Sequence, residues 1–209
     1  MDSYVGFFVG EYPKQVNGFE INPLENSVVS GQKIARNLSL ALTGLETKTF
    51  VNHEANLEAF SRAPRRCERL WFHFVGHGTS DALLMYDKTG GLAAVTPEML
   101  ASQLHNVIAS QVLVVIDCCY SGAFCEKLRE VLKGLGSLDH YHILSSTSEN
   151  ELAWEDNKLG STCFSLALFE AIKGAKLNDP YFGVSEKFAE ISKGTSASAF
   201  GLKRGAQQH

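Results

Sequence analysis

Residues 112–122, VLVVIDCCYSG, decide how this chain folds. Residues 112–116 are all β-branched or leucine, without a polar interruption, which is typical of a strand buried on both faces of a mainly parallel sheet. The sequence then changes abruptly to polar residues that include Cys118 and Cys119. Reactive groups in open α/β sheets gather at the carboxyl ends of strands. Cys119 is therefore a candidate nucleophile.

A second stretch, residues 70–78 with the sequence LWFHFVGHG, has the same form. It is an apolar run that ends in Gly76, His77 and Gly78. The two glycines permit close approach and unusual backbone angles around the imidazole. If both strands are neighbours in one sheet, His77 and Cys119 come within reach at its edge. Such a pair indicates thiol catalysis, because an imidazole can hold a cysteine as the thiolate.

These two strand ends, HG and later D-x-C-x-S-G, resemble those of the caspase-fold cysteine peptidases. The DCCYSG form is more similar to metacaspases and bacterial orthocaspases than to animal caspases, whose signature of Q-A-C, then Arg, Gln or Gly, then Gly is absent. The resemblance covers roughly residues 4–192, and only the strand ends are specific. It implies an α/β three-layer sandwich, with a mainly parallel central sheet flanked by helices.

The resemblance also implies a role for each site residue. Cys119 would be the nucleophile, and His77 the base that activates it and later protonates the leaving amine. The backbone N–H groups of Gly78 and Cys119 would form the oxyanion hole. Asp117 would point into the specificity pocket and select Arg or Lys through charge-assisted hydrogen bonds. Cleavage after a basic residue is therefore expected.

The substrate pocket departs from the family pattern. Val75 stands where the family usually has a serine, so one pocket hydrogen bond is missing. The second pocket carboxylate of metacaspases matches a position near Ser30 rather than an aspartate. Glu149 or Asp81 is left to compensate, and the expected pocket residues are Asp117, Glu149 and Ser30.

The cysteines and Asp117 also have structural interpretations, which compete with their functional ones. Free cysteines are often buried, and Cys118 should point to the opposite face of the strand from Cys119, so it is expected in the core with Cys67, Cys125 and Cys163. The joint motif with His77 is what favours catalysis for Cys119. Asp117 has an alternative role, as a cap for the helix that follows the catalytic turn.

A metal site is not predicted. His73 and His77 are four residues apart on a strand and share a face, so with Cys119 they imitate a metal site. Zinc usually needs three or four protein ligands, and no second ligand pair accompanies these. We expect no cofactor, although calcium stays open as an activator, because scattered carboxylates leave no linear signature.

Composition limits the class of protein. The chain has 209 residues, 44% hydrophobic, with a net charge of −4, which fits one domain with one substantial core. No basic block suggests nucleic acid, and no stretch reaches the roughly 18 apolar residues of a membrane span. The five cysteines, an odd number, indicate a reducing compartment, and the amino terminus does not resemble a signal peptide. We therefore expect a cytoplasmic protein.

Patterning predicts alternating strands and helices. Strands are expected at residues 4–9, 47–51, 70–75, 112–116 and 141–144, and helices at 24–42, 54–62, 96–109, 124–132, 161–172 and 184–191. Residues 10–23 should form a loop, and residues 79–95 a hairpin. Residues 1–195 would form the peptidase domain, and residues 196–209 a flexible tail that begins a linker to a further domain.

Two functions remain open. The favoured one is a regulated cysteine endopeptidase that cuts protein or peptide substrates after Arg or Lys, with a regulatory domain or partner protein as a trigger. The other is a noncatalytic caspase-like adaptor that acts through protein contacts, which requires an occluded pocket. A redox switch through Cys118 and Cys119 is disfavoured, because adjacent strand residues point apart.

Overall fold

Five parallel strands form the central sheet in the computed structural model, which describes residues 1–16, 19–153, 155–156 and 160–174. Their order across the sheet is β4-β1-β5-β8-β9. The strands are β1 (Ser3–Phe8), β4 (Glu46–Val51), β5 (Arg69–Val75), β8 (Gln111–Asp117) and β9 (Tyr141–Ser145). All of these strands are close to their predicted bounds. The expected adjacency of β5 and β8 is confirmed, with Val75 opposite Asp117.

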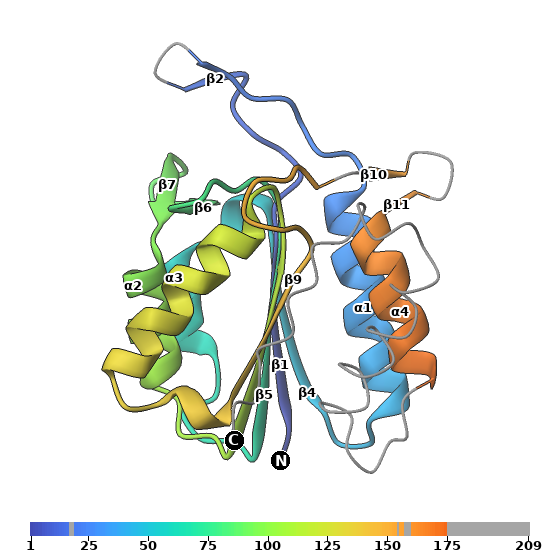
Figure 1. The fold of residues 1–209 in the computed structure, drawn as a ribbon. Coiled ribbons are helices and arrows are strands. Elements are labelled where there is room, and N and C mark those ends of the chain that lie inside the picture. Colours follow the sequence, from blue (N-terminus) through green and yellow to red (C-terminus); the bar gives the residue numbers. More distant parts are fainter. Residues whose placement is uncertain (17–18, 154, 157–159, 175–209) are drawn as a thin grey trace.

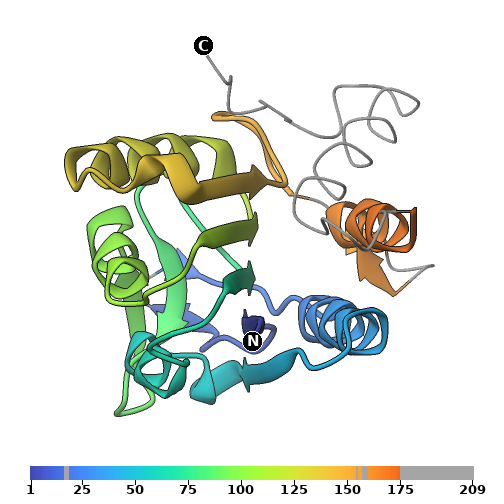
Figure 2. The ribbon, with the colours of Figure 1, turned by 90° about the horizontal axis from the view of Figure 1, so that it is seen from below.

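Helices cover both faces of this sheet, as Figures 1 and 2 show. Helices α1 (Ser27–Ala41) and α4 (Cys163–Gly174) lie on one face, and α2 (Pro97–His105) and α3 (Ser121–Gly134) on the other. The predicted α/β three-layer sandwich is therefore confirmed.

Strand β8 explains why the layers form. Successive side chains of a strand point to opposite faces. Val112, Val114 and Ile116 belong to the core beneath α2 and α3, whereas Leu113 and Val115 belong to the core beneath α1 and α4. All five are completely buried. Each such side chain contributes about 1.5–3 kcal/mol of burial free energy, which holds a helix layer against each face.

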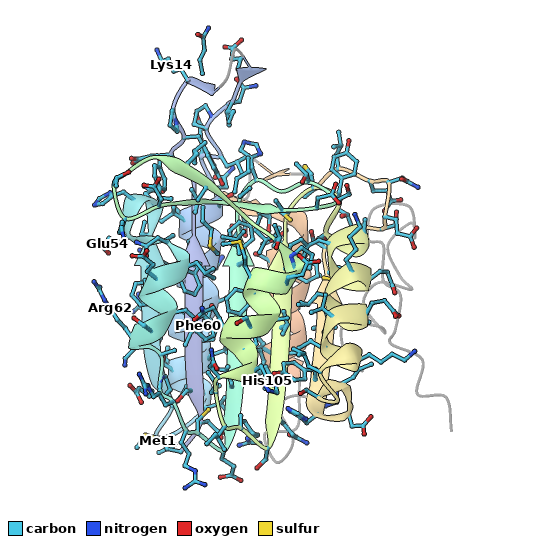
Figure 3. All side chains as sticks on the ribbon, turned by 90° about the vertical axis from the view of Figure 1, so that its left-hand side faces the viewer. Met1, Lys14, Glu54, Phe60, Arg62 and His105 are labelled. Atoms are coloured by element: carbon cyan, nitrogen blue, oxygen red, sulfur yellow. The ribbon has the colours of Figure 1, made fainter. Side chains whose placement is uncertain are left out.

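Smaller elements decorate the carboxyl end of the sheet. β6 (Leu83–Tyr86) and β7 (Leu92–Val95) form the predicted hairpin, and β10 (Glu155–Asp156) pairs with β11 (Ser161–Thr162). Residues 10–23, predicted as a plain loop, contain a further pair, β2 (Gln15–Val16) and β3 (Phe19–Glu20). We call residues 11–16 and 19–23 the arm, since they project beyond the sheet (Figure 1), with Lys14 at the far end from Met1 (Figure 3).

Two predicted helices differ from the structure. Residues 54–62 form two 3-10 turns, η1 (Asn52–Glu54) and η2 (Leu57–Arg62), because the Asn56 side chain accepts the Ala59 N–H and starts a new turn. Helix α2 ends at His105 instead of continuing to residue 109, since Ile108 exchanges backbone hydrogen bonds with the segment that precedes β5. A third 3-10 turn, η3 (Leu138–His140), leads into β9.

The remaining expectations concern the end of the chain and the membrane. The predicted helix at 184–191 and the tail at 196–209 lie outside the described residues. Among the helices of the described part, none has the length and apolar character needed to cross a bilayer.

Candidate active site

The ends of β5 and β8 lie side by side. The Gly76 N–H donates to the Asp117 carbonyl at 3.2 Å. His77 comes directly after Gly76, and Cys119 comes two residues after Asp117. A Cβ atom on Gly78 would lie 2.4 Å from the Cys118 Sγ and 3.3 Å from the Cys119 carbonyl oxygen. The structure therefore brings the His77–Gly78 peptide against the segment that contains Cys119, as the sequence predicted.

The imidazole of His77 is held by two residues of the arm. Its Nε2 lies 2.8 Å from the backbone carbonyl oxygen of Asn22. A carbonyl can only accept a hydrogen bond, so Nε2 carries a proton, and in the neutral imidazole Nδ1 keeps its lone pair. The Tyr12 ring packs against the imidazole, with 4.7 Å between the ring centroids. His77 is thus oriented with Nδ1 as its proton acceptor.

The turn after β8 is sharp. Tyr120 adopts a left-handed conformation, with φ of 55°, at the start of α3. This conformation costs about 1–2 kcal/mol for a residue other than glycine. Its N–H donates to the Glu151 carbonyl at 2.9 Å, and the Ser121 N–H donates to Thr147 Oγ1 at 2.9 Å. The loop that follows β9 therefore holds the turn in place.

Cysteine environments differ around this turn. Cys118 is 1% exposed, and burial raises its pKa well above the usual value, so it is the core residue that was predicted. Cys119 is half-buried. Cys125 is also in the core, where burial raises its pKa to about 12. Cys67 is only half-buried at the edge of the core, and the side chain of Cys163 lies outside the described part.

Asp117 lies in a buried cluster of hydroxyl groups, with 2% of its surface exposed. Its Oδ2 accepts hydrogen bonds from Thr162 Oγ1 at 2.5 Å and from Ser165 Oγ at 3.0 Å. Both donors stand at the start of α4. The alternative that Asp117 caps the helix after the catalytic turn is therefore wrong, because that helix is α3 and the carboxylate faces α4 instead.

Ser30 joins the same cluster from α1. Its Oγ lies 2.9 Å from Ser161 Oγ and accepts the Thr162 N–H at 3.0 Å. Two of the predicted pocket residues, Ser30 and Asp117, therefore share Thr162 as a neighbour. We call Ser30, Asp117, Ser161, Thr162 and Ser165 the Asp117 cluster.

The other candidate carboxylates lie elsewhere. Glu149 is exposed, and its backbone packs against Gly122 at the start of α3. Asp117 and Ser30, in contrast, are buried. Asp81 forms an ion pair with Lys127 of α3, and this hydrogen bond lowers the pKa of Asp81. It therefore lies on the α3 side, away from the Asp117 cluster.

The two strand histidines have separate surroundings. His73 is completely buried, its Nδ1 lies 2.7 Å from the Tyr4 hydroxyl, and burial lowers its pKa to about 3. His77 lies beyond the end of β5 and turns toward Tyr12. In the described ranges, no three His, Cys, Asp or Glu side chains gather in a way that could hold a metal ion.

Sequence reasoning missed several residues that shape the site. Tyr12 and Asn22 act on His77 across more than fifty residues, and Asn22 does so through its backbone, which no side-chain pattern reveals. Thr162 had a usable signal, since it precedes an apolar helix and its Oγ1 accepts the Ser165 N–H as a helix cap does. Thr147 gave none.

Comparisons with known proteins agree with this architecture. The family model for the caspase domain, Peptidase C14, matches residues 15–206. The crystal structure of protein GSU0716 from Geobacter sulfurreducens aligns with a TM-score of 0.59 and 12% identity, over 91% of this chain and 88% of that one. Raptor from Chaetomium thermophilum aligns with a TM-score of 0.55 and 14% identity, over 82% of this chain and 17% of Raptor. At such identities these two likenesses show the fold alone. No curated protein sequence matches the chain.

Proposed function

Since the chain belongs to the caspase-domain family, as the match over residues 15–206 shows, we propose that it is a cysteine endopeptidase with Cys119 as nucleophile and His77 as general base. The observation that carries this proposal is the 2.8 Å contact of His77 Nε2 with the Asn22 carbonyl. It leaves Nδ1 as the proton acceptor on an imidazole that stands at the same sheet edge as Cys119.

In the proposed reaction His77 first accepts a proton and later donates it. The Cys119 thiol first transfers its proton to His77 Nδ1, and the resulting thiolate then forms a bond to the peptide carbonyl carbon. The N–H groups of Gly78 and Cys119 donate to the resulting oxyanion. The imidazolium, stabilised by the Asn22 carbonyl at Nε2, then protonates the leaving amine as the C–N bond breaks. Water, activated by the same imidazole, hydrolyses the thioester.

We propose cleavage after Arg or Lys. The support is the Asp117 cluster, in which a carboxylate two residues before the nucleophile is buried among hydroxyl groups on the side of the sheet that α1 and α4 cover. A buried carboxylate with neutral hydrogen-bonding neighbours is suited to a cationic side chain, through charge-assisted hydrogen bonds. Ser30 would line this pocket where metacaspases have a second carboxylate.

Peptide hydrolysis tests the proposal. Fluorogenic peptides that end in Arg, Lys or Asp are incubated with the wild type, Cys119→Ala and His77→Ala, each with and without calcium. We expect hydrolysis after Arg or Lys in the wild type only. Cleavage after Asp alone would retain Cys119 but refute the role of Asp117. Hydrolysis that persists in Cys119→Ala would refute the nucleophile.

One observation favours a second candidate, a noncatalytic adaptor that acts through protein contacts. Asp117 is 2% exposed and its Oδ2 is already bonded to two hydroxyl groups of α4. A substrate cation therefore needs α4 or its preceding segment to move, and calcium, a regulatory domain or a partner protein would supply that trigger. An adaptor would show no hydrolysis under any of these conditions.

A further inference from the structure

We propose that Tyr12 is a positioning residue for the histidine of the dyad, which deepens and rests on the function proposed above. Its hydroxyl accepts the backbone N–H of His77 at 2.7 Å, and its ring lies 4.7 Å from the imidazole, at 54° to it. One side chain thus fixes both the main chain and the ring of His77. The adjacent peptide also carries the Gly78 N–H that we assign to the oxyanion hole.

The surroundings of Tyr12 leave its hydroxyl little freedom. The side chain is 9% exposed, and the hydroxyl donates to the Leu84 carbonyl at 3.4 Å while it accepts from His77. Burial raises the pKa of Tyr12 well above its usual value, so the phenol keeps the proton that this donation needs. The hydroxyl therefore joins the end of β5 to β6 through two directed bonds.

Gly76 fits the same arrangement from the other side. A Cβ atom at position 76 would lie 2.6 Å from the Tyr12 hydroxyl oxygen, closer than side-chain carbons approach. The glycine before the histidine therefore provides the space in which the Tyr12 hydroxyl reaches the His77 N–H. This gives the first glycine of the Gly-His-Gly motif a specific steric role.

The arm delivers this contact together with the second one. Tyr12 lies near the start of the arm, which follows β1, and Asn22 lies near the end of the arm. The Asn22 carbonyl contacts His77 Nε2. The Leu24 N–H donates to the Gly10 carbonyl at 2.8 Å and closes the base of the arm. Both contacts to His77 therefore come from one projecting segment (Figure 1).

Tyr12→Phe tests the role, because it removes the hydroxyl and keeps the ring. The matched control is Tyr86→Phe, which removes a hydroxyl that donates to Glu11 of the same arm at 2.9 Å without touching His77. The readout is the rate at which iodoacetamide alkylates Cys119 from pH 5.5 to pH 9, with the modified residue identified by mass spectrometry. This readout needs no substrate and no turnover.

We expect Tyr12→Phe to slow alkylation of Cys119 about fivefold at pH 6 and to leave it unchanged at pH 9, where hydroxide deprotonates the thiol without His77. Peptide turnover should show the same loss in kcat, with KM within about twofold of wild type. Tyr86→Phe should match the wild type throughout. If Tyr12→Phe fails to fold, 3-fluorotyrosine at position 12, a weaker acceptor, should give a smaller change in the same direction.

Two outcomes are distinguishable failures. If the wild type retains fast alkylation at pH 6 and Tyr12→Phe does too, the dyad stands and the role of Tyr12 is refuted. If Cys119 of the wild type reacts at pH 6 no faster than a free thiol, the proposed dyad fails and the inference fails with it.

Discussion

The hydroxyl of Thr162 donates a 2.5 Å hydrogen bond to Oδ2 of Asp117 and so ties the start of α4 to the end of β8. Both residues are buried. A hydrogen bond to a charged group contributes about 1.5–3 kcal/mol, and its loss leaves the carboxylate undersatisfied. Thr162→Val also removes the helix cap that Oγ1 provides for the Ser165 N–H, so we expect it to lower the free energy of unfolding by at least about 2 kcal/mol, measured by urea denaturation.

Thr89→Val is the control for this prediction. The Thr89 hydroxyl also donates to an aspartate, Asp87, at 2.6 Å, but the pair is on the surface, where water replaces the lost bond. Its urea midpoint should stay close to that of the wild type. Equal shifts in the two variants would show that burial of the Asp117 cluster has no energetic consequence.

Gly78→Ala should separate the two strand ends. The new Cβ would lie 2.4 Å from the buried Cys118 sulfur, so the backbone at position 78 must move. Displacement of about 1 Å in an active site can cost about a hundredfold in rate, and overpacking costs about 1–3 kcal/mol in stability. We expect kcat/KM in peptide hydrolysis to fall by about a hundredfold.

Gly134→Ala provides the comparison, because a Cβ at position 134, in the last turn of α3, meets no atom within 4 Å. Alanine there should leave kcat/KM unchanged and raise the free energy of unfolding by about 0.5–1 kcal/mol. A Gly78→Ala variant with wild-type kcat/KM would contradict the close packing of the strand ends.

Substrate preference depends on which carboxylate binds the cation. Asp117→Asn keeps the shape of the side chain and removes its charge, so kcat/KM for Arg and Lys peptides should fall by about a hundredfold or more, as expected when a buried charge pair of about 3 kcal/mol is lost. Glu149→Gln should change kcat/KM by less than about threefold, because Glu149 is exposed. The reverse ranking would place the pocket at Glu149.

Burial of His73 predicts a pH dependence of stability. Its pKa is lowered to about 3 in the folded protein, so the unfolded chain takes up the proton first as the pH falls below about 6.5. The contribution of the neutral His73 to the free energy of unfolding is therefore fully present above about pH 6.5 and is lost as the pH falls toward 3. Between pH 7 and pH 5 the loss amounts to about 2 kcal/mol.

His73→Gln should remove this part of the pH dependence, while its amide can still bond to the Tyr4 hydroxyl. His53→Gln, at an exposed position, should keep the wild-type dependence. Urea denaturation at pH 7 and pH 5 measures all three proteins. If His73→Gln loses as much stability as the wild type between these pH values, His73 is not buried as a neutral imidazole.

The sequence predicted the sheet and the position of the strand ends because both depend on local patterns. Val112 to Ile116 are apolar without interruption, and residues 70–75 are apolar except for His73, so the strands and their polar ends could be read directly. Their adjacency followed from how parallel sheets are built. This adjacency places Gly78 close to the backbone of Cys119.

The surroundings of the site depend on contacts that no local pattern encodes. Asn22 reaches His77 through a backbone carbonyl, and Tyr12 does so from another strand's end, so neither leaves a periodic signal. The alternative role of Asp117, as a cap for α3, was wrong for a related reason. A carboxylate can satisfy either of two nearby helix starts, and only the packing of α4 on β8 selects Thr162 over the start of α3.

A covalent probe tests the central claim most directly. A peptide that ends in arginine and carries an acyloxymethyl ketone should modify Cys119 and none of the other four cysteines, which peptide mapping by mass spectrometry would show. The same probe with a C-terminal aspartate should react far more slowly, and His77→Ala should abolish labelling. Modification of Cys67 in place of Cys119, or equal labelling by both probes, would contradict the assignment of nucleophile or of pocket.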